Sequence, residues 1–140
     1  METLKNNIRL VTFQVPAVLD EDNSPITSAI IDTKEIAAGA SSPSFDGALI
    51  RAIVGTFGAN VTSVKVKIHE SANSNGSSST LANGGTEATL SAAGEIVFQV
   101  NRTKRYLLAI ITIAASGATD TVPVCISGTL QNWAKPYPII

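Results

Sequence analysis

The side chains that could perform hydrolysis are few and lie far apart along the chain. His69 is the single histidine among 140 residues, so a Ser–His–Asp arrangement would need it as the general base. Asp32, Asp46 or Asp120 would have to orient its ring, and no serine stands in the Gly-x-Ser-x-Gly turn that exposes a nucleophile. His69 falls on the lysine-bearing side of an alternating segment. We therefore predict an exposed strand histidine, no catalytic residue and no enzymatic activity.

Metal, phosphate and nucleic-acid chemistry also lack the residues that they require. Cys125 is the single cysteine, which excludes an internal disulfide and a cysteine-rich zinc site, and its apolar surroundings predict a small core residue. The acidic residues 20–22 lack the spaced ligands and the glycine of a calcium loop. Gly84 and Gly85 have no Lys-Ser/Thr after them, as a phosphate loop needs. A net charge of −1 argues against phosphate-backbone binding, so we expect no cofactor, no metal and no nucleic acid.

The composition is that of a folded domain with a weakly charged surface. Hydrophobic residues make up 44% of the chain and charged residues 15%, whereas an average soluble domain carries roughly 25% charged residues. Such a surface must be covered by small polar residues or hidden against partners. No apolar run reaches the ~20 residues of a membrane span, and the first residues lack the apolar core of a signal peptide. We expect one domain, residues 1–140, which folds in a reducing cytoplasm without a membrane partner.

Strand patterns dominate the chain. In residues 64–69 apolar side chains alternate with lysine and histidine, as in a strand with one solvated face. Residues 105–115 are largely apolar, which is typical of a central strand covered on both faces. About nine runs separated by Gly, Asn and Pro turns indicate an all-β fold, an antiparallel β-sandwich of jelly-roll type. The predicted runs are residues 8–15, 26–32, 34–38, 49–57, 64–69, 87–90, 96–100, 105–115 and 121–130.

Two polar segments are interpreted as surface connections. Residues 71–79 read Ser-Ala-Asn-Ser-Asn-Gly-Ser-Ser-Ser, a low-complexity sequence that predicts a mobile loop, dispensable for folding. Arg102, Lys104 and Arg105 form the one dense basic run, which we interpret as a solvated turn between strands.

The C-terminal residues 133–140 are the candidate partner-binding segment. Two prolines exclude a helix or a central strand; they also hold the chain extended and reduce the entropy lost on docking. Trp and Tyr are enriched at interface hot spots, so we predict an extended arm that anchors an interface. The alternative, in which the arm folds back over its own sandwich, stays open. The residues concerned are Trp133, Pro136, Tyr137, Pro138, Ile139 and Ile140.

Several short motifs follow one another in an informative order. Residues 28–34 end in Asp-Thr-Lys, residues 66–71 form a valine-rich strand that ends in Glu-Ser before a polar loop, and residues 85–90 precede Lys-Arg-Tyr-Leu at 104–107. In this order they resemble small proteins of tailed bacteriophages and prophages encoded near the major capsid protein, interpreted as auxiliary head proteins of the cement or decoration kind. The resemblance covers residues 28–128.

This chain departs from that family in two places. The turn after Glu-Ser is Asn-Ser-Asn-Gly-Ser and not acidic, which leaves the role of the loop open. Leu108 stands where a polar or basic residue is expected, which indicates a more buried face here, with a partner as one way to cover it.

The resemblance implies a structural virion protein that binds the outer surface of the major capsid protein shell and stabilises it. Its location would be the outer capsid surface, after assembly in the host cytoplasm. Self-association is also expected, with a homodimer favoured because two-fold symmetry is commonest and a trimer at capsid three-fold positions as the competing form. The alternative function is a carbohydrate- or receptor-binding module of a phage fibre or tail. That function needs exposed aromatic side chains, for which the chain offers Trp133, Tyr106 and Tyr137.

Overall fold

The computed structural model describes residues 8–20, 25–34, 45–116 and 120–131, which form strands joined by turns. No helix occurs in these described residues, and therefore none that is long and apolar enough to cross a membrane. The strands are β1 (Ile8–Asp20), β2 (Ile26–Thr27), β3 (Ile31–Asp32), β4 (Gly47–Val54), β5 (Val61–Ser71), β6 (Thr80–Leu81), β7 (Ala88–Leu90), β8 (Gly94–Asn101), β9 (Tyr106–Ala115) and β10 (Thr121–Gln131).

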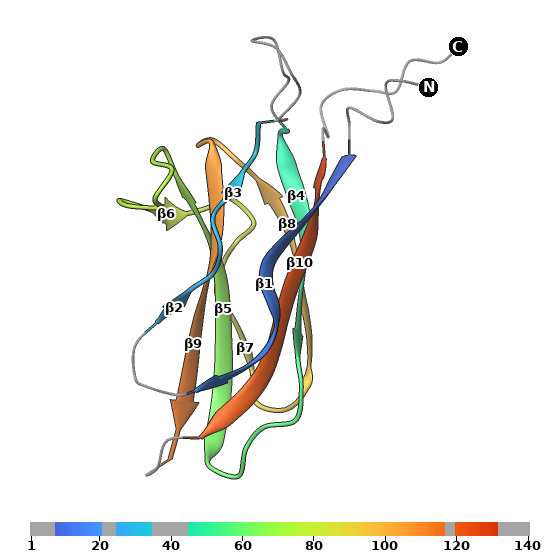
Figure 1. Cartoon of the computed structure of the whole chain (residues 1–140), viewed down its shortest axis with the longest axis vertical. Helices are drawn as coiled ribbons and strands as arrows, with labels where there is room; N and C mark the ends of the chain where they lie inside the picture. The colour runs from blue at the N-terminus through green and yellow to red at the C-terminus, as the bar shows by residue number, and fades with distance from the viewer. Residues whose placement is uncertain (1–7, 21–24, 35–44, 117–119, 132–140) are drawn as a thin grey trace, which may run out of the picture.

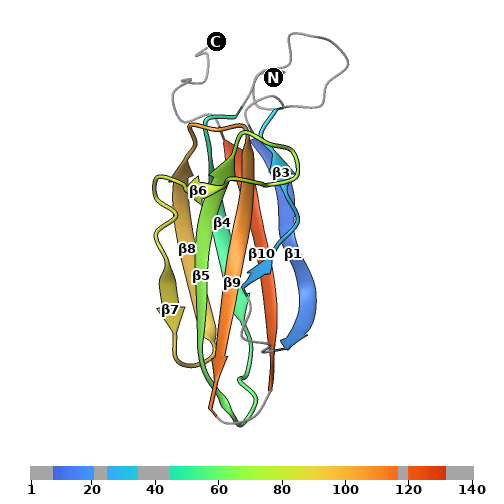
Figure 2. The ribbon, with the colours of Figure 1, turned by 90° about the vertical axis from the view of Figure 1, so that its left-hand side faces the viewer.

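The strands form two facing sheets (Figure 1, Figure 2). Sheet A has the order β1-β10-β4-β8, and sheet B has the order β2-β9-β5-β6. β3 joins β2 along one edge of β9, while β7 joins β6 along one edge of β5. Each of these two pairs acts as one interrupted strand, so the described chain has the strand order of a jelly roll. All pairings are antiparallel, and the predicted fold class is confirmed.

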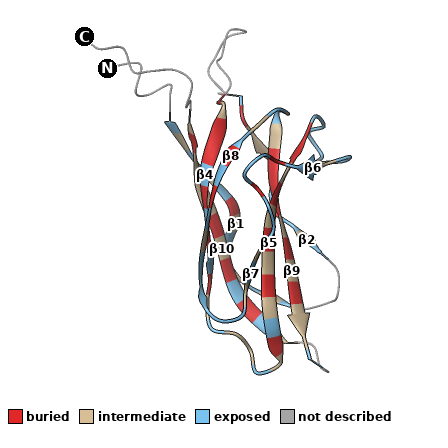
Figure 3. Ribbon diagram, turned by 180° about the vertical axis from the view of Figure 1, so that it is seen from behind, coloured by how far each residue is buried: buried red, intermediate tan, exposed pale blue. Residues whose placement is uncertain are grey.

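The core lies between the sheets and is built by the alternation of side chains along each strand. Buried and exposed positions alternate along β4 and β8, as Figure 3 shows. Fully burying one aliphatic or phenyl side chain contributes about 1.5–3 kcal/mol, so a core of this size can hold the sheets together. Its largest fully buried side chains are Phe13, Phe45, Ile50, Ile68, Leu107, Ile111, Ile126, Leu130, Val64, Val66, Val100 and Val122.

β1 does not end where the sequence predicts. Pro16 is expected to end or bend the predicted run 8–15. β1 continues past it, and its register against β10 shifts between Thr12 and Gln14 and again between Gln14 and Ala17. β1 is an edge strand of sheet A, where a missing N–H group is tolerated and a bulge absorbs the irregularity. Residues 17–20 of β1 therefore also pair with β10 and extend the edge of sheet A.

The structure corrects the interpretation of β9 and β10. β9 is central in sheet B, but of its outward-facing residues Leu108 is buried whereas Ile110 and Thr112 are half-exposed. Coverage on both faces is therefore limited to one end of the strand. In β10 the buried positions are Val124 and its alternating neighbours. Cys125 consequently points to the outer face of sheet A, where it is half-exposed, and is not the core residue that was predicted.

Candidate functional site

Three of the motifs that carry the resemblance, in residues 28–34, 66–71 and 104–107, meet at one end of sheet B although they are far apart in sequence. The fourth, in residues 85–90, pairs with the other half of β5. Arg105 donates two hydrogen bonds to the carboxylate of Asp32, from Nε at 2.8 Å and from Nη2 at 2.7 Å. This bidentate pair lowers the pKa of Asp32 below its ordinary value. The backbone amide of Thr33 donates to the carbonyl of Arg105 at 3.1 Å, and the guanidinium lies over the ring of Tyr106, 5.1 Å from its centroid.

Glu70 makes a second set of contacts at this end of sheet B, which connect the end of β5 to the turn before β9. It is only 5% exposed, and its carboxylate accepts hydrogen bonds from the Thr103 amide at 2.7 Å, the Thr103 hydroxyl at 2.5 Å and the Lys104 amide at 3.2 Å. Burial by itself raises the pKa of Glu70, but these hydrogen bonds outweigh it, and the pKa lies below its ordinary value. Lys104 Nζ also donates to Thr80 Oγ1 at 2.9 Å. The basic run is therefore the predicted turn between strands, here β8 and β9, in which Arg105 remains exposed. Hydrogen bonds hold Lys104 and Arg105 in place within it.

His69 differs from the predicted exposed histidine. It is half-buried, and its Nδ1 lies 2.9 Å from Ser79 Oγ. Burial, followed by the charge of Lys67, lowers the pKa of His69, so the neutral ring is favoured at pH 7. A catalytic triad would also need a carboxylate on this ring. Asp32 is engaged by Arg105, and Asp120 accepts hydrogen bonds from two backbone amides.

Metal ligands do not gather either. Among the residues that the structure describes, no group of three His, Cys, Asp or Glu side chains is placed to hold a metal ion. In the described residues, neither a set of metal ligands nor a carboxylate beside His69 is brought together.

Residues 72–79 form a mostly exposed loop, as the sequence predicts, which is hydrogen-bonded to itself and to the end of β5. Ser71 Oγ donates to the carbonyl of Ser77 at 2.6 Å and accepts from the amide of Asn73 at 3.0 Å. The side chain of Asn75 accepts from the Ser77 amide at 3.0 Å. These bonds satisfy backbone groups inside the loop, so its polar composition serves a defined shape.

The same loop covers the outer face of sheet B. Gly76 has φ = +74°, and a β-carbon there would stand 3.0 Å from Ile30 Cδ1 and 3.6 Å from Leu108 Cδ1. Leu108 is 2% exposed because Ile30 and this loop lie against it. The more buried face that the sequence predicts at Leu108 is therefore confirmed, and the chain itself covers it.

The outer face of sheet A is different, because it gathers aliphatic side chains that the described chain leaves open. Leu10 is 81% exposed, Val18 65% and Val97 58%. Scattered surface aliphatics are ordinary, but several on one sheet indicate an interaction surface; here Ser127 and Thr129 of β10 lie between those of β1 and those of β4. The exposed large hydrophobic side chains on β1, β4 and β8 are Ile8, Leu10, Val15, Val18, Leu49, Ile53 and Val97.

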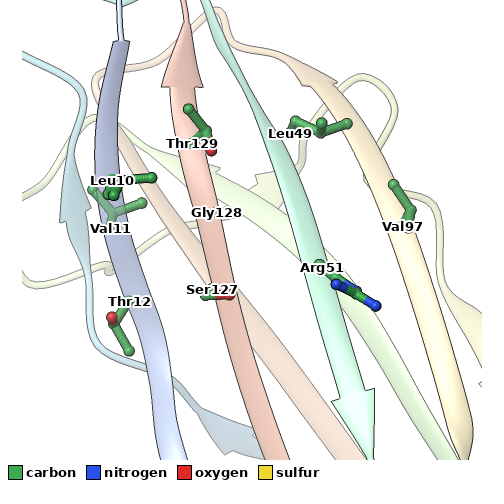
Figure 4. A pocket seen from close by; sticks show the side chains of 9 residues that line it. All are labelled: Leu10, Val11, Thr12, Leu49, Arg51, Val97, Ser127, Gly128 and Thr129. Atoms are coloured by element: carbon green, nitrogen blue, oxygen red, sulfur yellow. The ribbon is translucent and has the colours of Figure 1, made fainter.

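A shallow, open hollow lies at one end of this face, which we call the sheet A hollow (Figure 4). Strand register places Leu10, Thr129 and Leu49 in one row, and Thr12, Ser127, Arg51 and Val97 in the next. The floor on β10 consists of Ser127, Gly128 and Thr129, whose small side chains leave about 550 Å³ between the larger neighbours. Arg51 Nε donates to Glu95 Oε2 at 2.6 Å, so the cation at the margin is already neutralised.

The predicted partner-binding residues cannot be compared with this surface directly. Trp133, Pro136, Tyr137, Pro138, Ile139 and Ile140 lie outside the described residues. The predicted strand 34–38 also falls largely outside them. The structure does show where this segment begins. β10 ends at Gln131, which pairs with Ile8 and Gly47 beside the sheet A hollow.

Sequence reasoning missed the outer face of sheet A. Residues 49–57 were interpreted as one long apolar run, in which Leu49 and Ile53 alternate with Ile50 and Ala52. A strand that is apolar on both sides is either covered twice or presents an apolar surface. That two-sided pattern is the signal that could have indicated the face.

Comparisons with known proteins give distant structural likenesses. No protein-family model matches the chain, and no curated protein sequence matches it. A solved structure of Bacillus endospore appendages, described as disulfide-linked pili, is 14% identical with a TM-score of 0.46, over 89% of this chain and 90% of that one. A chain of infectious bursal disease virus strain Gx is 13% identical with a TM-score of 0.45, over 92% and 33%.

A third likeness is to the CBM22-1–GH10 modules of Clostridium thermocellum xylanase 10B. It is 11% identical with a TM-score of 0.38, over 96% of this chain and 28% of that one. This chain therefore spans about a third or less of the viral and xylanase chains. Likenesses this distant assign no activity to it.

Proposed function

We propose that the chain is a structural virion protein, a cement or decoration protein that binds the outer surface of the major capsid protein shell of a bacteriophage and stabilises it. The observation that carries this proposal is the outer face of sheet A. It carries seven exposed aliphatic side chains on β1, β4 and β8 with small polar side chains of β10 between them, and its Arg51 and Glu95 pair with each other. Apolar area removed from water contributes about 25 cal/mol per Å², which favours a protein partner over a small polar ligand.

The capsid as that partner is supported by the order of the sequence motifs. The residues of that order, from Asp32 through Glu70 to Arg105, hold strands of sheet B together. A rigid scaffold with one open apolar face suits a protein that reinforces a shell and performs no chemistry. We accordingly propose that the chain is not an enzyme.

A carbohydrate- or receptor-binding module of a fibre or tail is the second candidate. Sugar recognition uses exposed aromatic rings, and among the described residues none of the exposed large hydrophobic side chains is aromatic. Tyr106 is half-buried beneath Arg105. This candidate therefore depends on Trp133 and Tyr137, outside the described residues.

Co-sedimentation with preformed capsids, assembled from the major capsid protein encoded nearby and lacking this protein, tests the proposal. Val18→Lys and Ile53→Lys place charges on the half of the face away from the hollow, at positions exposed enough to leave the fold intact. We expect each to weaken capsid binding at least about tenfold, with an unchanged melting temperature. Lys67→Glu, on the outer face of sheet B, is the matched control and should bind normally. Wild-type binding by both sheet A variants, or binding to glycans in place of capsids, would overturn the proposal.

A further inference from the structure

The sheet A hollow lies directly beside the place where the chain leaves the sandwich. Thr129, on its floor, stands two residues before Gln131, the last residue of β10. The next nine residues, 132–140, read Asn-Trp-Ala-Lys-Pro-Tyr-Pro-Ile-Ile and carry one charge. An apolar segment thus starts at the rim of an apolar hollow, whose large walls are Leu10, Leu49 and Val97.

The chemistry of the hollow fits an extended, proline-containing segment. Its walls are aliphatic, its floor is formed by small residues of β10, and its charged side chain is already paired with Glu95. Flat rings such as those of Trp133 and Tyr137 could fill the space between the large side chains with little loss of rotamer freedom.

The segment is poorly suited to reach the hollow of its own molecule. Lys135 and Tyr137 each precede a proline, which favours an extended backbone. An extended segment reaches a neighbouring copy without the reversal that the hollow of its own molecule requires. A second copy faces no such restriction.

We propose that the sheet A hollow binds residues 132–140 of a second copy of this chain. The donor segment and the acceptor hollow lie at the same end of the same strand, so a two-fold axis beside that end lets two copies exchange segments and closes the assembly as a dimer. The proposal deepens the proposed function, on which it rests for its setting: copies linked in this way would reinforce one another on the shell.

A complementation experiment between two full-length variants tests the exchange. In the hollow variant, Leu10→Lys places a charge at the rim, at a position exposed enough to leave the fold intact. In the arm variant, Trp133→Ser, Tyr137→Ser and Ile139→Ser remove the apolar groups of the segment. Molar mass in solution is measured by light scattering or sedimentation, and circular dichroism confirms folding. We expect the wild-type chain to be a dimer and each variant alone to be a monomer, with dimerisation weakened at least about tenfold.

The mixture of the two variants is the decisive sample. The arm variant keeps an intact hollow and the hollow variant keeps an intact segment, so the mixture should form a mixed dimer through one exchanged segment. Val18→Lys is the matched control, because Val18 is also an exposed aliphatic residue of β1 but lies outside the hollow. It should dimerise as the wild type does. A mixture that stays monomeric, or loss of the dimer by Val18→Lys, would overturn the proposal.

A peptide experiment separates a second copy from self-occupancy. Trp133 is the single tryptophan, so the arm variant has none, and a peptide of residues 132–140 supplies the only tryptophan signal. We expect its emission to shift to shorter wavelength on binding the arm variant, with affinity reduced at least about tenfold by adding Leu10→Lys and unchanged by adding Val18→Lys. If the emission of the peptide does not shift, the hollow does not bind this segment. If the peptide binds but the wild-type chain stays monomeric, the occupant of the hollow is not a second copy. None of these samples contains capsids, so they fail or succeed independently of the proposed function.

Discussion

The outer faces of the two sheets arise from the same alternation of side chains, but they differ in which side chains they carry and in how far these are covered. On sheet B, Lys65, Lys67 and His69 point outward from β5, and residues 72–79 lie over Leu108. Leu81 of β6, which pairs with His69, is the one large hydrophobic side chain among the described residues of this sheet that stays exposed, at 48%. On sheet A seven large aliphatic side chains of β1, β4 and β8 are exposed, with Leu10 at 81%. The chain's own loop covers part of one face, and the other face is open in the described structure.

The contrast shows where stability and binding reside. The polar groups at the end of sheet B form hydrogen bonds within the chain. Substitutions there should therefore lower the free energy of unfolding. The aliphatic groups of sheet A contribute little to the monomer because water still reaches them. Substitutions on that face should therefore change association and leave folding nearly intact.

The largest effect is expected from Glu70→Ala. This change removes the buried carboxylate that accepts hydrogen bonds from the partly buried amides of Thr103 and Lys104, and the loss of a partner at such a site costs about 1–3 kcal/mol. We expect urea unfolding to show a loss of about 2–3 kcal/mol. Glu95→Ala, which removes the exposed ion pair of sheet A, is the control and should cost about 0–1 kcal/mol. Equal losses in the two variants would remove the distinction between the faces.

A smaller loss is expected when the loop over sheet B is removed. Replacing residues 73–79 by a Gly-Asn turn uncovers Leu108 and deletes the Ser79–His69 bond, and we expect a loss of about 1–2 kcal/mol. The sequence by itself predicts a dispensable loop. Leu108→Thr should be costly in the intact protein and nearly neutral in the loop-deleted one. A simple sum of the two losses would show that the loop does not cover Leu108.

A pH dependence of stability should follow from His69. Its pKa is lowered in the folded state, by burial and then by Lys67, from an ordinary value of 6.5. The unfolded chain therefore takes up a proton more readily, so the contribution of the neutral ring is present above pH 6.5 and is lost as the pH falls through the folded pKa. We expect the stability difference between wild type and His69→Gln to change across this window. A constant difference from pH 8 to pH 5 would contradict the half-buried environment.

The smallest effect on folding is expected on sheet A. Val18→Thr and Ile53→Thr replace exposed aliphatic side chains outside the sheet A hollow by β-branched polar ones, which strands accept. Each should change the free energy of unfolding by about 0.5 kcal/mol or less. Together they should reduce the fluorescence of a bound apolar dye such as ANS, which reports open apolar surface. A loss comparable with that of Glu70→Ala would show that this face is part of the folded core.

Much of the architecture could be predicted from local patterns. Alternation in residues 64–69 identified the solvated side of β5, and the spacing of turns indicated an antiparallel sandwich of jelly-roll type, which the strand order confirms. These features are readable because side chains of a strand alternate between its faces, whatever its neighbours are. Strand ends were less accurate, as at Pro16, because an edge position tolerates what a central one does not.

The candidate sites depended on contacts between distant parts of the chain. Asp32 and Arg105 are 73 residues apart, and nothing in their local sequence indicates that these two side chains form an ion pair. The polar composition of residues 71–79 likewise predicts a loop, but only its position over Leu108 makes it a cover.

The sequence by itself determined which residues share a side of each strand, and hence the fold class and the absence of a recognisable catalytic motif. Only the tertiary structure decided which side was covered and by what, as Leu108 beneath its loop and Leu10 in the open demonstrate. The physical reason is that alternation is a property of one strand, whereas burial is a property of whatever lies against it. That second layer is set by register, bulges and connections that bring distant segments together.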